Sequence, residues 1–194
     1  DVGHGTKVAG TSRNFEQGSL VETGKDLDMA IEGDGFFEVV LPDGTSAYTR
    51  DGAFQVNGSG EVVTIDGYKV AAMDAIETGT TEITIASDGS VSTVVNGTSS
   101  TKSRITLVRF INPEGLRPIG RNLYKETVSS GTPQTGQNPG ESGVGTIAHR
   151  YLEASNVVAA KELVNMITTQ RAYEATSKAI KASDEMMRQA NDLR

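Results

Sequence analysis

The stretch Asn156–Asp192, NVVAAKELVNMITTQRAYEATSKAIKASDEMMRQAND, contains no Gly and no Pro, and its apolar residues recur at helical spacing. Ser155 or Asn156 could cap a helix here, because either side chain can accept a hydrogen bond from a free N–H of the first turn. At 1.5 Å per residue this helix would be roughly 55 Å long. The sequence therefore predicts one long C-terminal helix over residues 155–194, which is longer than a small domain is wide.

Part of the apolar pattern of this predicted helix repeats every seven residues, from Ala159 to Met187. A seam of this spacing is typical of a helix that packs against other helices. The residues that we predict to form a self-assembly face are Val157, Ala160, Leu163, Val164, Met166, Ile167, Tyr173, Ile180 and Met187. An amphipathic helix folded back on its own domain is the simpler alternative. It accounts for Val157–Ile167 but leaves Tyr173 and Ile180 in water, so we favour contacts between chains.

The sequence before this helix has the texture of an antiparallel β domain. Asp-Gly and Asn-Gly pairs, which mark tight turns, separate short β-branched and aromatic runs. These runs are FFEVVL, SAYTR, AFQV, EVVTI, YKVAAM, EITIAS, SVSTVV and RITLVRFI, between Phe36 and Ile111. The predicted fold class is therefore mainly β, with an antiparallel β-rich domain of short strands and one long C-terminal α-helix.

Four segments follow from these patterns. Residues 1–26 are polar without a sustained period and predict an extended arm or linker, and residues 27–128 predict the β-rich domain. Residues 129–154 begin with a Gly-, Ser-, Pro- and Gln-rich stretch and predict a linker that returns to the core of the assembly. Residues 155–194 predict the helix.

The composition excludes several classes of partner and site. The formal net charge of -7 argues against nucleic acid as a partner, since nucleic acid selects clustered Lys and Arg. No cysteine is present, which excludes disulfides and thiolate metal sites. His4 and His149 are the only histidines and stand in no zinc-binding context. No apolar run approaches the roughly 20 residues of a membrane span.

Motifs for catalysis or cofactors are weak. Gly143–Ala148 spells G-x-G-x-x-A, but no buried strand leads into it, as a dinucleotide site requires. The Asp-Gly pairs are spread one per hairpin and supply no calcium-loop ligand set. We therefore predict no catalytic residue, no metal, no cofactor and no small-molecule substrate.

Three blocks of the sequence resemble the bacterial flagellar rod and hook protein family. They are KDLDMAIEGDGFFEVVLPDGTSAYTRDGAFQVNGSGEVVTIDGYKV (25–70), FINPEGLRPIGRNLYKETVSSGTPQ (110–134) and YLEASNVVAAKELVNMITTQRAYEATSKAIKASDEMM (151–187). The resemblance covers residues 5–190. The pairing of LPDGTSAYTRDGAF with LEASNV and ELVNMI-x-x-QRAYE is most similar to the distal rod members.

The resemblance implies a non-enzymatic subunit of the distal rod, which forms a helical tubular polymer and transmits torque from motor to hook. It implies an inner-tube role for the C-terminal helix and an outer layer built from the β-rich domain. The implied partners are further copies of the chain, proximal rod and hook subunits, and the rings around the rod. The implied location is the basal body, in the rod that crosses the periplasm, after export by the flagellar secretion apparatus without a cleaved signal peptide.

Two alternatives stay open at this point. The chain could be a hook or proximal rod subunit of the same family, or a secreted β-rich binding module with a coiled-coil stalk. The family also has an N-terminal helix that this sequence, which begins at Asp1, does not contain. We therefore expect the sequence to be part of a longer protein.

Overall fold

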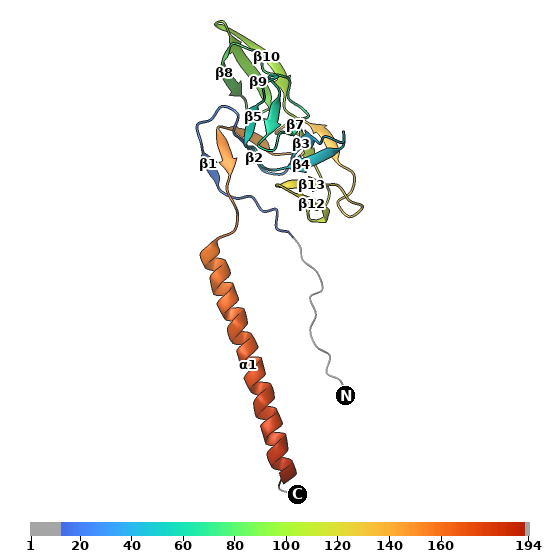
Figure 1. The fold of residues 1–194 in the computed structure, drawn as a ribbon, viewed down its shortest axis with the longest axis vertical. Helices are drawn as coiled ribbons and strands as arrows, with labels where there is room; N and C mark the ends of the chain where they lie inside the picture. The colour runs from blue at the N-terminus through green and yellow to red at the C-terminus, as the bar shows by residue number, and fades with distance from the viewer. Residues whose placement is uncertain (1–12, 193–194) are drawn as a thin grey trace. The chain divides into compact units, whose positions relative to one another are not determined.

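The computed structural model describes residues 13–192, and the side chains of residues 13–189. The chain divides into two compact units, residues 1–154 and residues 155–194. The first unit contains the β-strands and one short 3₁₀ turn, η1 (Pro113–Gly115), and the second contains the helix α1 (Ala159–Asp192) (Figure 1). The predicted fold class, mainly β with antiparallel sheets and one long C-terminal helix, is confirmed.

The strands of the β unit are short. They are β1 (Leu20–Glu22), β2 (Met29–Glu32), β3 (Phe37–Val40), β4 (Ser46–Thr49), β5 (Phe54–Val56), β6 (Val62–Thr64), β7 (Lys69–Val70), β8 (Thr80–Ile85), β9 (Ser90–Val95), β10 (Thr98–Arg104), β11 (Leu107–Arg109), β12 (Arg117–Gly120), β13 (Leu123–Lys125), β14 (Gln134–Gln137), β15 (Thr146–His149) and β16 (Tyr151–Glu153).

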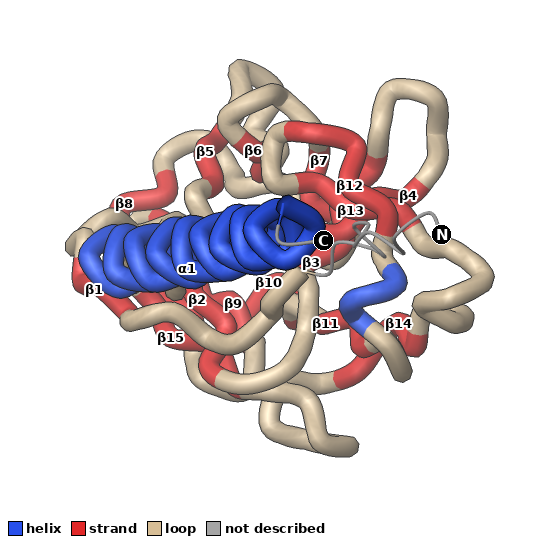
Figure 2. Tube along the Cα trace, turned by 90° about the horizontal axis from the view of Figure 1, so that it is seen from below, coloured by secondary structure: helices blue, strands red, loops and turns tan. Residues whose placement is uncertain are grey.

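These strands form one large sheet and several small ones, and all the pairings between them are antiparallel. The large sheet has seven strands in the order β12-β13-β4-β3-β7-β6-β5. The meander β8-β9-β10 forms a three-stranded sheet, whose strands lie side by side in Figure 1. Three two-stranded sheets complete the unit: β1-β16, β15-β2 and β11-β14, the last of which lies along one side of the unit in Figure 2.

The Asp-Gly turns behave as the sequence predicts. Asp43 accepts hydrogen bonds from the Thr45 N–H and hydroxyl at 2.9 and 2.6 Å, which closes the turn between β3 and β4. Asp88 accepts from the N–H and hydroxyl of Ser90 at 3.0 and 2.8 Å in the turn between β8 and β9. Gly89, which follows Asp88, has φ +82°, a conformation that an L residue with a Cβ rarely adopts. Local hydrogen bonds and glycine therefore help to fix the position of these two hairpins.

Two apolar clusters stabilise the β unit. The larger one is built from β2, β3, β4 and the strands beside them, and its fully buried side chains include Met29, Phe37 and Leu107. The second cluster is aromatic: Phe36, Tyr48 and Phe110 meet edge to face, with ring centroids 4.8–5.7 Å apart. Aromatic pairs in this geometry are each worth about 0.5–1.5 kcal/mol beyond the area they bury.

The structure differs from the expectation for residues 129–154, which we predicted to be a linker. This segment carries β14, β15 and β16, which pair with β11, β2 and β1. Its apolar residues Val144 and Ile147 are buried in the larger core cluster. The Gly- and Pro-rich composition reflects the turns between these strands, so the segment completes the β unit instead of leaving it.

The predicted N-terminal arm also contributes to the β unit. Residues 1–12 of the arm lie outside the described residues, but residues 13–26 include strand β1, which pairs with β16. The ring of Phe15 packs edge to face on Phe36 and Tyr124, with centroids 5.6 and 5.3 Å apart. The described part of the arm is thus held by a distant part of the chain, which a local pattern cannot reveal.

Candidate assembly surface

Helix α1 begins later than the sequence predicts. Its first helical hydrogen bond runs from the N–H of Glu162 to the carbonyl of Val158, so Val158 occupies the N-cap position. The hydroxyl of Ser155 accepts a hydrogen bond from the N–H of Val157 at 3.2 Å and forms a turn before the helix. Ser155 and Asn156 are therefore not the N-cap residues. Val157, one of the predicted face residues, precedes the helix.

The threonines of α1 satisfy their hydroxyls within the helix itself. Thr168 and Thr169 both donate to the carbonyl of Asn165 at 2.8 Å, and Thr176 donates to the carbonyls of Ala172 and Tyr173 at 3.1 and 2.8 Å. A hydroxyl bonded to its own helix needs no partner from a neighbour. These three hydroxyls therefore need no hydrogen-bond partner outside the helix.

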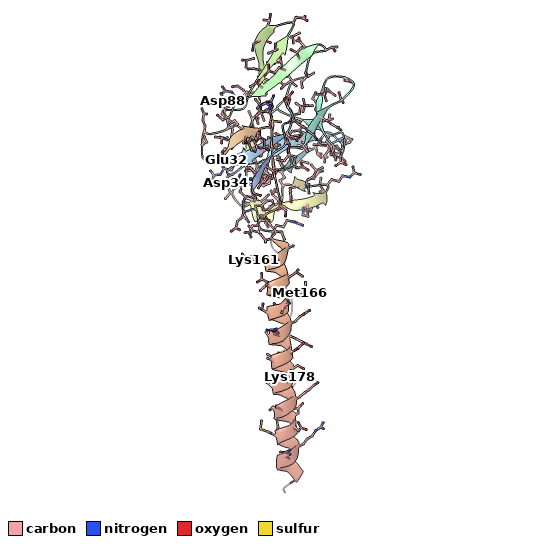
Figure 3. All side chains as sticks on the ribbon, turned by 90° about the vertical axis from the view of Figure 1, so that its left-hand side faces the viewer. Glu32, Asp34, Asp88, Lys161, Met166 and Lys178 are labelled. Carbon is pink, nitrogen blue, oxygen red and sulfur yellow. The ribbon has the colours of Figure 1, made fainter. Side chains whose placement is uncertain are left out.

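All nine residues of the predicted self-assembly face are exposed. The exposed fraction is 58% for Leu163, 76% for Tyr173 and 63% for Ile180. Val158 and Met186 are exposed to a similar extent, although they are not among the predicted face residues. An apolar surface of this extent is typical of a surface that another molecule covers. In Figure 3, side chains including those of Lys161, Met166 and Lys178 stand out from the helix.

The helical geometry separates the predicted face residues into two groups, because each residue advances about 100° around the axis. The first group, which we name the N-half face, consists of Ala160, Leu163, Val164, Met166 and Ile167. The second group contains Tyr173, Ile180 and Met187, and it continues over apolar residues that are not among the predicted face residues. We name the complete group the C-half face; it consists of Ala172, Tyr173, Ala175, Ala179, Ile180, Ala182, Met186 and Met187.

The two faces point to nearly opposite sides of the helix axis, with centres about 155° apart at 100° per residue. The side of the C-terminal half that continues the N-half face is charged instead, and carries Arg171, Glu174, Lys178, Lys181, Glu185 and Arg188. The side of the N-terminal half that continues the C-half face carries Lys161, Asn165 and Thr168. The faces meet at one edge, where Met166 and Tyr173 lie about 20° apart, so one straight partner could lie along that edge but could not cover the centres of both faces.

A network of hydrogen bonds around Arg50 fixes the last strand of the β unit. Nε of Arg50 donates to Oε2 of Glu153 at 2.9 Å, and both side chains are largely buried. The guanidinium also donates to the carbonyls of Gly33 and Gly35 at 3.1–3.2 Å. The other carboxylate oxygen of Glu153 accepts from the N–H of Gly18 at 2.9 Å. Arg50 and Glu153 thus join β4, β16, the turn after β2 and the N-terminal segment.

The described residues contain neither a candidate metal site nor a candidate membrane-spanning helix. Within residues 13–192, no three His, Cys, Asp or Glu side chains gather as a metal site. His4 lies outside the described residues, and Nε2 of His149 lies 2.8 Å from the carbonyl oxygen of Asp26, where its N–H can donate. No helix in the described part of the chain has the length and apolar content that crossing a membrane requires.

Comparisons with known proteins match both units of the chain. The family model for the flagellar hook protein FlgE/F/G D1 domain matches residues 30–93, and the model for the flagellar basal body rod FlgEFG protein C-terminal matches residues 148–193. The flagellar basal-body rod protein FlgG of Borreliella burgdorferi is 48% identical over 197 residues, which cover 100% of this chain and 74% of the relative. The chain belongs to the FlgG family of flagellar basal-body rod proteins.

Other relatives support membership of the FlgG family. FlgG of Buchnera aphidicola subsp. Acyrthosiphon pisum is 44% identical over 99% of this chain and 74% of the relative. In Caulobacter vibrioides, FlgG is 43% identical over 100% of the chain and 74% of the relative, whereas FlgF is 35% identical over 93% and 71%. The predicted resemblance is confirmed, and it is stronger to FlgG than to FlgF within one organism.

Proposed function

We propose that this chain is a structural subunit of the flagellar distal rod, which self-assembles into a helical tubular polymer and transmits torque from the motor to the hook. The observation that carries the proposal is the exposed apolar surface of α1 in a member of the FlgG family. The β unit has its own buried core, so the helix is free to provide the contacts between copies.

Burial of the exposed side chains drives the assembly. A large apolar side chain contributes about 1.5–3 kcal/mol when it is fully buried. Leu163, Ile167 and Ile180 are each exposed by about half or more, so most of this contribution is available for contacts between copies. Ordering and docking costs oppose it, and only the surplus appears as affinity. A repeated head-to-tail contact that does not close into a ring then produces a filament.

The two units have separate roles in this proposal. Helix α1 forms the inner layer of the tube, and the β unit forms the outer layer and stiffens the rod by lateral contacts. Neighbouring partners are proximal rod and hook subunits and the rings around the rod. The subunit resides in the basal body, in the part of the rod that crosses the periplasm, and the flagellar secretion apparatus exports it without a cleaved signal peptide. No catalytic step belongs to this role.

The proposal predicts that charges on the apolar surface of α1 abolish rod assembly. In the full-length protein, Met166→Asp combined with Ile180→Asp places one carboxylate on each half of the helix. Burying an unpaired carboxylate costs several kcal/mol, so copies carrying both changes should not associate. Electron microscopy of basal bodies measures assembly, and far-ultraviolet circular dichroism checks that the β signature persists.

A matched control separates the position of the charges from their number. Asn165→Asp combined with Gln189→Asp also adds two carboxylates to α1, but on the polar side of each half. This control should assemble as the unchanged protein does. Normal rods built from the Met166→Asp and Ile180→Asp variant would contradict the proposal.

A further inference from the structure

The chain contains two Asn-Gly pairs with almost identical neighbours in sequence. Residues 56–59 read VNGS and residues 95–98 read VNGT, so the same residue precedes each pair and a similar hydroxyl residue follows it. The backbone nitrogen after an asparagine can attack the side-chain amide carbon, and glycine leaves that nitrogen unshielded because it has no Cβ. Since the local sequences match, the fold decides how the reactivities of Asn57 and Asn96 differ.

The fold holds the side chain of Asn57 in place. Its Oδ1 accepts hydrogen bonds from the N–H groups of Ser59 and Glu61 at 2.9 and 3.0 Å. Its Nδ2 donates to Oε2 of Glu61 at 3.1 Å, and the other oxygen of that carboxylate accepts from Nζ of Lys69 at 2.8 Å. Both polar atoms of the Asn57 amide are thus bonded, and these bonds must break before its carbon can approach the nitrogen of Gly58.

Asn96 lies in the two-residue turn between β9 and β10, which the pair Val95–Thr98 closes. The φ values of Asn96 and Gly97 are +50° and +78°, as a type I′ turn requires. Asn96 is exposed, and in the part of the chain that the structure describes no group forms a hydrogen bond to its side-chain amide. A Cβ at Gly97 would meet no atom within 4 Å, so the approach to this position is open.

We propose that Asn96 is a site of spontaneous deamidation, in which the backbone nitrogen of Gly97 attacks Cγ of Asn96. The new bond between this nitrogen and Cγ closes a cyclic imide, and Nδ2 leaves as ammonia with the proton of the Gly97 N–H. Water then opens the ring at either of its carbonyl groups, which leaves aspartate or isoaspartate at this position. The net reaction consumes water and releases ammonia, and it needs no oxidant or reductant.

The hydrogen bonds of Asn57 predict how far the two rates differ. Each bond that must break lowers the population of the open side chain by a factor of about 2–10. With three such bonds, Asn57 should deamidate at least about tenfold more slowly than Asn96 in the folded protein. Attack at Asn96 requires only local opening of an exposed turn, which costs far less than global unfolding.

The two products change the turn between β9 and β10 in different ways. Aspartate at position 96 keeps a pair that suits a type I′ turn, and it adds one negative charge to a chain whose formal net charge is already -7. Isoaspartate carries the main chain through Cβ, which lengthens the backbone of the turn. The two-residue geometry is then lost, and the Val95–Thr98 pair is the first to open.

Peptide mass spectrometry of the full-length protein tests this proposal. After incubation at physiological temperature, trypsin releases residues 51–69 and 70–102, and each peptide contains one of the two asparagines and no other. Peptide 70–102 should gain the mass that replacement of NH₂ by OH brings, and peptide 51–69 should lag by about tenfold or more. Equal rates in the folded protein, faster loss of Asn57 or a stable Asn96 would each overturn the proposal.

The same peptides, incubated after digestion, provide the matched control. Both asparagines have lost the fold there and have nearly the same neighbours, so their rates should agree. A persistent difference between the free peptides would assign the effect to sequence and overturn the structural argument. Isomerisation of the Asp-Gly pairs leaves the mass unchanged, so it does not disturb either measurement.

Two further measurements test the hydrogen bonds and the cyclic imide separately. Glu61→Ala removes the acceptor of Nδ2 and should speed the loss of Asn57 by about threefold or more. Asn96 in the same molecules is the internal control and should keep its rate, whereas an unchanged Asn57 would contradict the role of these bonds. Hydroxylamine cleaves cyclic imides, so it should cut the folded protein after Asn96 and spare Asn57. Deamidation of Asn96 without this cut would contradict the attack by Gly97.

Discussion

At the scale of single residues, close backbone approaches decide which positions tolerate a side chain. Gly52 lies where the chain passes Met29, and the N–H of Met29 donates to the carbonyl of Gly52 at 3.1 Å. A Cβ on Gly52 would overlap the carbonyl oxygen of Met29, and that atom is backbone that cannot swing away. The requirement for glycine here comes from a contact between segments, since Gly52 has no positive φ.

Gly52→Ala is therefore expected to destabilise the β unit by about 1–3 kcal/mol, the usual range for overpacking. Gly58→Ala is the matched control, because no atom lies within contact distance of a Cβ at Gly58 and its φ is not positive. This control should be neutral or stabilise by about 0.4–1 kcal/mol. Urea unfolding followed by circular dichroism measures both, and equal effects of the two changes would contradict the argument.

Tyr48 lies in the aromatic cluster, and its phenol loses its proton at a higher pH than a free tyrosine. Burial raises the pKa of Tyr48 to about 12, and the charges of Glu38 and Glu126 add to the shift. A phenol in the unfolded chain has a pKa near 10. Because the folded pKa is the higher one, the contribution of Tyr48 to stability is fully present below pH about 10 and is lost as the pH rises toward 12.

Ultraviolet titration of the tyrosines should therefore show a last phenolate step near pH 12, which arises from one of five tyrosines. Tyr48→Phe keeps the ring in the cluster and should remove this step and no other. The stability of Tyr48→Phe should fall less steeply than that of the unchanged protein above pH about 10. Persistence of the late step in Tyr48→Phe would assign it to another tyrosine.

At the scale of elements, the packing of short strands depends on a few long-range links. Strand β16 has three residues, and one of them, Glu153, is held by Arg50 just after β4. A fork-shaped guanidinium can bond a carboxylate and several carbonyls together, which the ammonium of lysine cannot do. The positions of β16 and of the N-terminal segment therefore depend on one side chain that follows a different strand.

Arg50→Ala is expected to cost about 3 kcal/mol of unfolding free energy, because it leaves the largely buried Glu153 carboxylate unpaired. Arg50→Lys should cost less but should not restore full stability, since it keeps the charge and loses the fork. Lys69→Ala removes a more exposed ion pair with Glu61 and serves as the control, with an expected change below about 1 kcal/mol. Denaturant unfolding measures the free energy of unfolding of each variant. If Arg50→Ala left this free energy unchanged, the proposed role of the Arg50–Glu153 link would be contradicted.

Helix α1 shows why spacing alone gives an incomplete description of an element. A seven-residue repeat predicts a seam, but on a straight helix the repeat drifts by about 20° per heptad. The residues between the repeats then decide which side is apolar. In α1 they place the N-half and C-half faces on nearly opposite sides, and Met186 and the alanines belong to the second of them.

At the scale of the whole molecule, the two units differ in the source of their stability. The β unit buries its own core of Met29, Phe37 and Leu107, whereas the apolar residues of α1 remain exposed. Helices in water gain most of their stability from packing an apolar face. For this reason the changes Met166→Asp and Ile180→Asp are expected to remove rod assembly and to leave the β unit folded.

The sequence alone predicted much of this protein. The Asp-Gly and Asn-Gly turns, the runs from β3 to β9 and the helix are local signals, because turn chemistry and periodicity act over a few residues. The apolar residues of the helix were also visible, and the family blocks predicted the relationship to flagellar rod proteins that the comparisons confirm.

Only the tertiary structure decided where segments distant in sequence meet. Strand β10 has a polar sequence and exists through its pairing with β9, and residues 129–154 join the β unit because β14–β16 find partners far along the chain. The folded chain also brings Arg50 to Glu153 and brings Gly52 close to the backbone of Met29, although both pairs are distant in sequence. Local propensity fixes a turn or a helix, whereas pairing and burial depend on residues that the folded chain alone brings together.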